Sequence, residues 1–130
     1  MTAPEVRDLI ATWQDRLGLR DWRIAPVLIP ASAIDDEGRV ARCYYWAEAL
    51  RAKLHLAAKC EAATMEANVV HELAHLVMAE TVTIAKAAAN QLGPDARALT
   101  LELLEAADER AVRRWERCLC GAAADSYFRE

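Results

Sequence analysis

The sequence contains no apolar run long enough to cross a membrane. Charged residues interrupt every hydrophobic stretch well before the roughly 18 residues that a transmembrane helix requires. The first segment, MTAPEVRDLIATWQDRLGL, carries acidic side chains where a secretory signal would have a continuous apolar core. We therefore expect a cytoplasmic protein without a membrane partner.

An excess of positive charge is also lacking. The chain has 16 Lys and Arg against 20 Asp and Glu, which gives a net charge of −4. Because phosphate binding favours a basic surface, this composition predicts that nucleic acid is not a partner. The local basic segment ERAVRRWER has acids interleaved among its arginines and is typical of a solvated helix face.

Internal repeats, low-complexity linkers and a disulfide framework are absent as well. The composition, 55% hydrophobic and 28% charged, is that of a globular protein. The four cysteines lack a secretory context, so we expect reduced thiols. Cys118 and Cys120 could in principle bind a metal, but they are more typical of a helix end. A chain of 130 residues can bury roughly two-thirds of its unfolded surface, and we expect a single domain over residues 1–130.

The N-terminal half predicts one helix followed by three strands. Thr2, Pro4 and Glu5 match a capping box that opens the helix, and Gly18 ends it. Apolar runs and alternation predict three strands, in the segments DWRIAPVLIP, RVARCYYWAEA and LRAKLHLAA. The polar segment ASAIDDEG connects the first two strands. Because the connections are short, we expect a small, mainly antiparallel three-stranded sheet.

The C-terminal half predicts two long helices. Helical spacing begins near Glu61 and continues to the segment NQLGPD, where glycine and proline interrupt it. A last helix runs from about Pro94 to Leu119, and Gly121 ends it. The expected fold is therefore α+β, with an N-terminal helix, a small sheet and two helices that complete the domain.

The composition does not indicate a function, but the segment VVHELAHLV, residues 69–77, contains a pattern typical of a metal site. His71 and His75 lie four residues apart on one helical face, where two imidazoles can bind one ion at about 2.1 Å. Glu72 points about 100° away, so it can take a proton from water instead of binding the ion. The pattern predicts one Zn²⁺ per chain, although manganese, iron and cobalt accept the same ligands.

The histidine face is predicted to be covered. The opposite, core-facing arc of this helix comprises Met65, Val69, Leu73, Leu76, Val77 and Ile84. The neighbours of the histidines are small or apolar, namely Thr64, Ala67, Met78 and Val82. A helix buried on two sides can also hold histidines that merely satisfy hydrogen bonds in the core, and this is the alternative to a metal site.

Zinc enzymes generally use three protein ligands, so a third must come from elsewhere. A longer histidine motif would need glycine and histidine where Met78 and Thr81 stand, and His55 lies on the charged side of a predicted strand. Acids of the last helix are therefore considered.

Three acids of the last helix are candidates for the third ligand. The apolar stripe of this helix is predicted to comprise Leu101, Leu104, Val112, Trp115 and Leu119. Asp108 lies within that stripe, whereas Glu105 and Glu109 share a face beside it. A buried carboxylate without a partner is costly, so Asp108 should contact a metal, a histidine N–H or an arginine. Helical spacing alone leaves the choice among the three acids open.

With HELAH followed by an acidic helix, the sequence resembles zincin metallopeptidases of the gluzincin type. More narrowly it resembles small metallopeptidase-like proteins of phages and prophages, over residues 19–119. The resemblance implies a minimal zincin-like fold in which His71, His75 and Glu109 bind zinc. It also implies Glu72 as the general base.

The same resemblance implies how a substrate would be held. In zincins an edge strand pairs with an extended peptide, and the segment AKLHL would be that strand here. Hydrolysis also needs a donor to the developing oxyanion. The candidates are Tyr44, Tyr45, His55 and Tyr127.

Taken with the resemblance, the sequence predicts a zinc-dependent hydrolase, a peptidase with a peptide or protein substrate. The first alternative is a non-catalytic zincin-like module that keeps zinc for stability and binds a protein partner. The second is a helical scaffold without metal. The intact Glu72 favours hydrolysis, because a purely structural zinc site does not need a base at that position.

Overall fold

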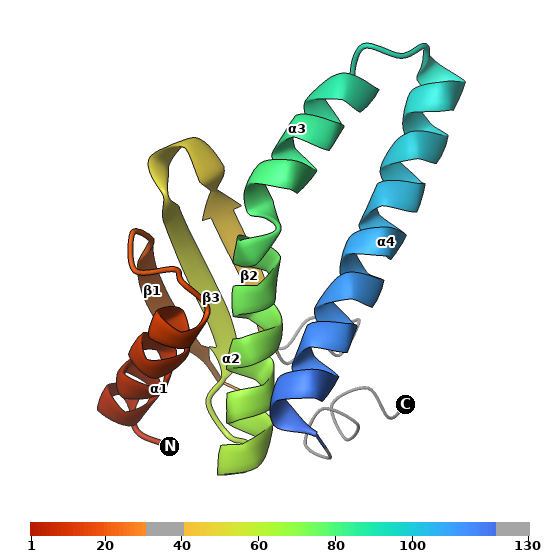
Figure 1. Ribbon diagram of the computed structural model, residues 1–130. Coiled ribbons are helices and arrows are strands. Elements are labelled where there is room, and N and C mark those ends of the chain that lie inside the picture. The colour runs from red at the N-terminus through yellow and green to blue at the C-terminus, as the bar shows by residue number, and fades with distance from the viewer. Residues whose placement is uncertain (31–40, 122–130) are drawn as a thin grey trace.

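The structure is a computed structural model that describes residues 1–30 and 41–121. The elements run in the order α1 (Ala3–Arg16), β1 (Arg23–Ile29), β2 (Ala41–Trp46), the 3₁₀ turn η2 (Ala47–Ala49), β3 (Arg51–Ala57), α2 (Ala62–Val77), α3 (Ala79–Ala89) and α4 (Pro94–Cys120). The predicted α+β class is confirmed. Figure 1 shows α1 and α2 beside the sheet, with α3 and α4 extending from it as an antiparallel pair. The expected connection ASAIDDEG lies outside the described residues.

The predicted capping box opens α1. Glu5 N–H donates to Thr2 Oγ1 at 3.3 Å, and Thr2 N–H donates to Glu5 Oε2 at 2.7 Å. The helix ends before Gly18, whose φ of 71° is readily adopted by glycine. Its buried side chains are Val6, Ile10 and Trp13, and they join the core formed by the sheet and α2. Local signals in the sequence were therefore sufficient to place this helix.

The sheet is mixed, with strand order β1-β3-β2. Strand β3 pairs antiparallel with β2, as predicted, but parallel with β1. The η2 turn, completed by Leu50 at φ 49°, reverses the chain between β2 and β3 and explains their antiparallel pairing. The prediction that AKLHL forms an edge was wrong, because β3 is bonded on both sides.

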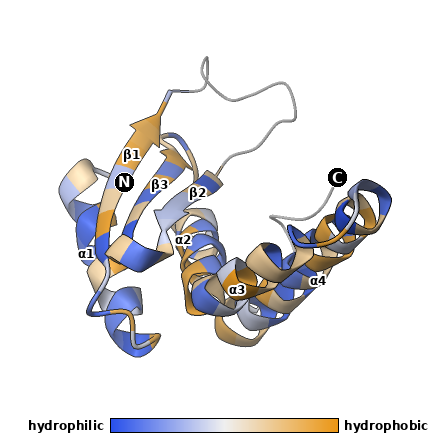
Figure 2. Cartoon of the chain, turned by 90° about the horizontal axis from the view of Figure 1, so that it is seen from above, coloured by the Kyte–Doolittle hydropathy of each residue, from blue (hydrophilic) through white to orange (hydrophobic). Residues whose placement is uncertain are grey.

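Alternation along β3 separates two faces of the sheet. Ala52, Leu54 and Leu56 are buried under the helices, whereas Arg51 and Lys53 are exposed on the other face. Figure 2 shows this alternation as bands of orange and blue along the strand. Both α1 and α2 contribute to the core beneath the first of these faces, so His71, Glu72 and His75 are carried by a helix that lies against the sheet.

The helix predicted from Glu61 to NQLGPD is divided at Met78 into α2 and α3. Hydrogen bonding continues through the division, since Met78 N–H donates to Ala74 O at 3.3 Å and Val82 N–H to Met78 O at 2.9 Å. Helix α2 stays against the sheet, while α3 leaves it to pack along α4 (Figure 1). For this reason Ile84, predicted on the core arc, is 71% exposed. Neither glycine nor proline marks the bend in the sequence.

The inward face of α4 also differs from the predicted stripe. Trp115 and Leu119 are 42% and 39% exposed. The positions turned toward the protein recur every four residues, at Leu104, Asp108, Val112, Glu116 and Cys120. A four-residue row is one of the ridges by which helices pack at an angle, and this row moves polar residues inward.

The remaining sequence expectations concern thiols and membranes. Cys43, Cys60, Cys118 and Cys120 form no disulfide in the structure, and their reduced state stays a prediction. Cys118 is exposed and Cys120 packs against the core, which is the helix-end arrangement favoured above. In residues 1–30 and 41–121, no helix has the length and apolar character that would span a membrane.

Candidate metal centre

Helix α2 is buried around most of its circumference. It packs against β2 and β3 on one side and against α4 on another. His71 and Glu72 are therefore only 3% and 4% exposed, although both are polar. The expectation that the histidine face is covered is confirmed, and α4 is the element that covers it.

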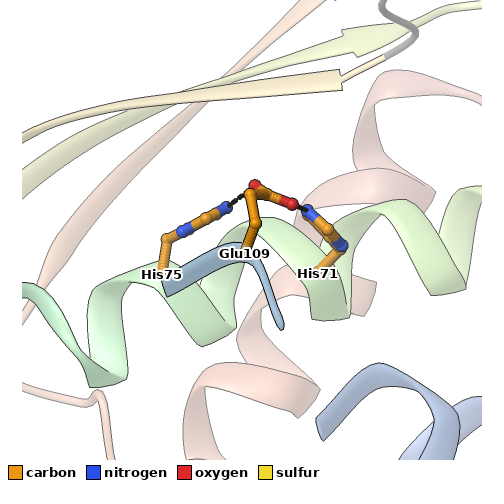
Figure 3. A group of neighbouring side chains, drawn as sticks. All are labelled: His71, His75 and Glu109. Atoms are coloured by element: carbon orange, nitrogen blue, oxygen red, sulfur yellow. Dashed lines mark ion pairs between the residues drawn. The ribbon is translucent and has the colours of Figure 1, made fainter. Parts of the chain in front are cut away.

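The two histidines and Glu109 meet between α2 and α4 (Figure 3). Glu109 Oε1 lies 2.9 Å from His75 Nε2, and Glu109 Oε2 lies 3.5 Å from His71 Nε2. One ligand atom from each of the three residues lies within 4.8 Å of the others. Ligand atoms bound to a tetrahedral zinc at about 2.1 Å lie roughly 3.4 Å from one another. Small shifts of these three side chains would therefore bring their ligand atoms to the separations that an ion requires. A His-His-Glu group that could bind a metal ion is thus present.

A carboxylate holds the other ring nitrogen of each histidine. Asp108 Oδ2 lies 3.0 Å from His75 Nδ1, and Glu116 Oε2 lies 3.2 Å from His71 Nδ1. An ionised carboxylate only accepts hydrogen bonds, so each Nδ1 beside one carries a proton. Both Nε2 atoms are then turned toward Glu109, in the carboxylate–histidine arrangement that is common at zinc sites.

Helical spacing did not choose among the three acids of the last helix, and in the structure these acids have different surroundings. Asp108 contacts a histidine, as its position in the stripe predicted, and Glu109 contacts both. Glu105 is exposed and outside the group. His55 lies on β3, on the face of the sheet that points away from α2.

Sequence reasoning missed Glu116, which is fully buried. It lies seven residues after Glu109, two helical turns away on nearly the same face, and that spacing was the available signal. Its Oε1 and Asp108 Oδ1 have no hydrogen-bond partner among the described residues. Burying such groups is costly, and this cost is more easily understood at a functional site than in an ordinary core.

The charges of the group are strongly coupled. Burial would lower the pKa of His71 and His75, but hydrogen bonds to the surrounding carboxylates outweigh it and raise these values to about 9 and about 10. Hydrogen bonds from His71 and His75 lower the pKa of Glu109 far below its usual range. In the metal-free protein, therefore, the Nε2 atoms of both histidines carry protons that face the ionised carboxylate of Glu109.

Glu72 belongs to the same electrostatic cluster without being one of the three. Burial raises its pKa, the charges of His71 and His75 oppose this rise, and that of Glu109 adds to it. The thiol pKa of Cys43, on β2, is raised by burial and further by Glu72. Glu72 is thus a buried carboxyl whose charge raises the pKa of both histidines and of the Cys43 thiol on the neighbouring strand.

Three of the four predicted oxyanion donors lie in the described residues. Tyr44 and His55 contact each other, with ring centroids 4.9 Å apart, on the face of the sheet that points away from α2. Tyr45 lies on the opposite face, and burial followed by the charge of Asp108 raises its pKa. Tyr127 lies outside the described residues. Of these candidates in the described residues, Tyr45 is therefore the one on the same side of the sheet as His71, His75 and Glu109.

No protein-family model, curated protein or solved structure gives a significant match to this chain. What the site can do must therefore be argued from its own residues. The donor set of two imidazoles and a carboxylate fits zinc, manganese, iron or cobalt.

Metal affinity is expected to rise with pH beyond the range in which ordinary histidines titrate. His71 and His75 keep their protons up to pKa values of about 9 and about 10, and a metal must displace both protons. The apparent association constant should therefore increase by up to about 100-fold per pH unit on the acid side of these values. Competition against a zinc-binding dye from about pH 6.5 to about pH 8.5 measures it. A plateau above about pH 7 would show ordinary histidines instead.

Thermal unfolding of the metal-free protein checks the same histidine pKa shifts. Here the pH dependence has the opposite sign, because stability falls where metal affinity rises. The folded-state pKa of each histidine is raised from 6.5, so its stabilising contribution is full below pH 6.5. It is lost as the pH rises through about 9 and about 10. Added zinc should therefore increase Tm more at alkaline than at slightly acidic pH.

Replacing the carboxylates that hold Nδ1 should weaken metal binding without abolishing it. Asp108→Asn and Glu116→Gln preserve shape but remove the charge that fixes each imidazole, and such changes typically cost about 10–100-fold in affinity. The dye competition gives the affinities, and Glu105→Gln on the same helix is the matched control. Equal affinity in all four proteins would mean that these contacts do not support a metal site.

Proposed function

We propose that this chain is a zinc-dependent hydrolase that cleaves peptide bonds. In this proposal His71, His75 and Glu109 hold one zinc ion, and Glu72 is the general base. The observation that carries it is the buried, coupled position of Glu72 on the helix that also presents both histidines. A site that served only to hold a metal would gain nothing from a buried carboxyl there.

The remaining residues support this chemistry by position. Zinc bound by the three side chains would polarise a carbonyl and lower the pKa of a bound water to about 7. Asp108 and Glu116 fix the histidine rings through Nδ1, so that Nε2 of each is directed at the same point. Glu72, whose pKa is raised by burial, can accept a proton from water and deliver it to the leaving amine. Tyr45 keeps its phenolic proton and can donate to a developing oxyanion.

A second candidate is a zinc-binding module without catalytic activity that binds a protein partner. It is favoured by limited access, because the side chains of His71 and His75 are only 4% and 15% exposed. Glu109, at 37%, is the most accessible of the three. The two proposals share the metal and differ in the role of Glu72.

Hydrolysis of an unfolded protein such as reduced casein, and of a mixed peptide library, distinguishes the two candidates. The zinc-loaded protein should cleave at least one of them, a chelator should stop cleavage, and added zinc should restore it. A protein that binds zinc but leaves both substrates intact would support the non-catalytic module. Cleavage that the chelator does not affect would contradict both candidates.

A further inference from the structure

The outer sheet face, which points away from α1 and α2, concentrates cations and aromatic rings. We define it by Arg23 on β1, Arg51 and Lys53 on β3, and Arg42, Tyr44 and Trp46 on β2. Strand pairing arranges them in rows: Arg51 lies between Arg23 and Trp46, and Lys53 lies beside Tyr44. The three strands include no Asp or Glu. In a chain with a net charge of −4, the charged side chains of these three strands are therefore all basic.

Two of the cations on this face repel each other. Arg23 and Arg51 are direct neighbours on adjacent strands, and like charges in that position destabilise a sheet. Among the described residues, no carboxylate forms an ion pair with Arg23, Arg51 or Lys53. Stability of the fold alone does not account for such a row, whereas an anionic ligand would.

The aromatic rings are exposed and partly fixed. Trp46 is 49% and Tyr44 41% exposed. The guanidinium of Arg42 lies 5.6 Å from the centroid of the Tyr44 ring and donates a hydrogen bond of 3.0 Å to its hydroxyl. His55 holds the same ring from another side, at a centroid distance of 4.9 Å. Tyr44 thus presents a ring whose orientation is set before any ligand binds.

We propose that the outer sheet face binds single-stranded nucleic acid. Bases stack on Tyr44 and Trp46, while phosphates contact Arg23, Arg51 and Lys53. An acidic peptide would use the cations but would not need two exposed rings among them, which is why nucleic acid fits better. The net charge of the chain argued against this partner, but net charge does not report how charges are distributed. The proposal does not depend on the metal centre, which lies on the other side of β2 and β3.

Tryptophan fluorescence can report binding at this face directly. Of the four tryptophans, Trp13 and Trp22 are 5% and 6% exposed, and Trp115 on α4 is 42% exposed. In a Trp115→Phe background, Trp46 is the exposed one. A single-stranded oligothymidylate of about ten nucleotides should quench its emission at low salt, because a base stacks on the indole. Anisotropy of the same oligonucleotide, carrying a fluorescent label, gives the affinity.

Three variants test which residues carry the binding. Trp46→Ala should weaken binding at least about fivefold, the lower end expected for loss of one stacked base. Arg51→Gln combined with Lys53→Gln should weaken it and reduce the salt slope by about 1.4, or roughly 0.7 for each lost phosphate contact. The matched control is Arg110→Gln combined with Arg114→Gln, which removes the same charge. These two arginines line a basic hollow of about 220 Å³ on α4 with Arg113 and Arg117.

Binding that survives the α4 control but not the sheet variants supports the proposal. It is overturned if the oligonucleotide neither binds nor quenches Trp46, or if both double variants weaken binding equally while Trp46→Ala has no effect. Polyphosphate and polyglutamate serve as anions without bases. If either displaces the oligonucleotide as well as unlabelled oligonucleotide does, base stacking is not used and this ligand class is wrong. Thermal melts of each variant verify the fold.

Discussion

Glu72→Gln is expected to lower the rate of peptide hydrolysis by about 10²–10⁴-fold while the protein keeps its metal. Glutamine has the shape of glutamate but cannot accept the proton of the attacking water. Because Glu72 is not one of the three clustered ligands, the metal content should be unchanged. The loss should appear in kcat and not in KM, since the substrate is still bound.

The same substitution makes an opposite prediction for stability. Burial raises the pKa of Glu72, so its ionised form opposes folding above the unfolded value of 4.5. The neutral glutamine side chain removes that cost, and the metal-free variant should melt no lower than wild type at neutral pH. Glu80→Gln, at an exposed position of α3, is the control for a surface carboxylate. Undiminished hydrolysis by the Glu72→Gln variant would remove Glu72 from the mechanism.

Glu109→Ala should have the largest effect on the metal itself. Glu109 is the side chain that joins α4 to both histidines, at 2.9 and 3.5 Å. Its removal takes away one of the three proposed ligands, so the affinity should fall by more than the roughly 100-fold upper limit for supporting residues. In the metal-free protein it also removes a carboxylate from beside two protonated imidazoles, which should lower Tm. His75→Ala should likewise lose the metal.

The comparison with the supporting residues gives this prediction its specificity. The expected order of metal affinity is wild type and Glu105→Ala first, then Asp108→Asn and Glu116→Gln, and Glu109→Ala last. An affinity for Glu109→Ala within tenfold of that for Glu116→Gln would assign both the same supporting role. The ligand set would then have to be revised.

Local features of this fold were predictable from the sequence because local rules determine them. The capping box at Thr2 and Glu5 and the alternation along β3 depend on neighbours within four residues. The histidine pair is equally local, since four residues return a helix to the same face. For this reason the motif, the covered histidine face and the expectation for Asp108 agree with the structure.

Long-range features were not predictable in the same way. Insertion of β3 between β1 and β2 depends on how the whole sheet assembles, and it made AKLHL a central strand. The bend at Met78 has no glycine or proline to mark it, and it exposed Ile84. The four-residue row of α4 arises from its packing and brought Glu116 inward in place of Trp115. The choice of Glu109 over Glu105 rested on a family resemblance, because helical spacing allowed both.

The most direct test of the metal centre is the zinc content of protein purified without a histidine tag. Wild type is compared with Glu105→Ala and Glu109→Ala, before and after zinc is added back and excess removed. The proposed ligand set of His71, His75 and Glu109 predicts about one zinc per chain for wild type and for Glu105→Ala, and none for Glu109→Ala. Wild type that stays free of zinc after add-back would contradict this account, as would full retention of zinc by Glu109→Ala.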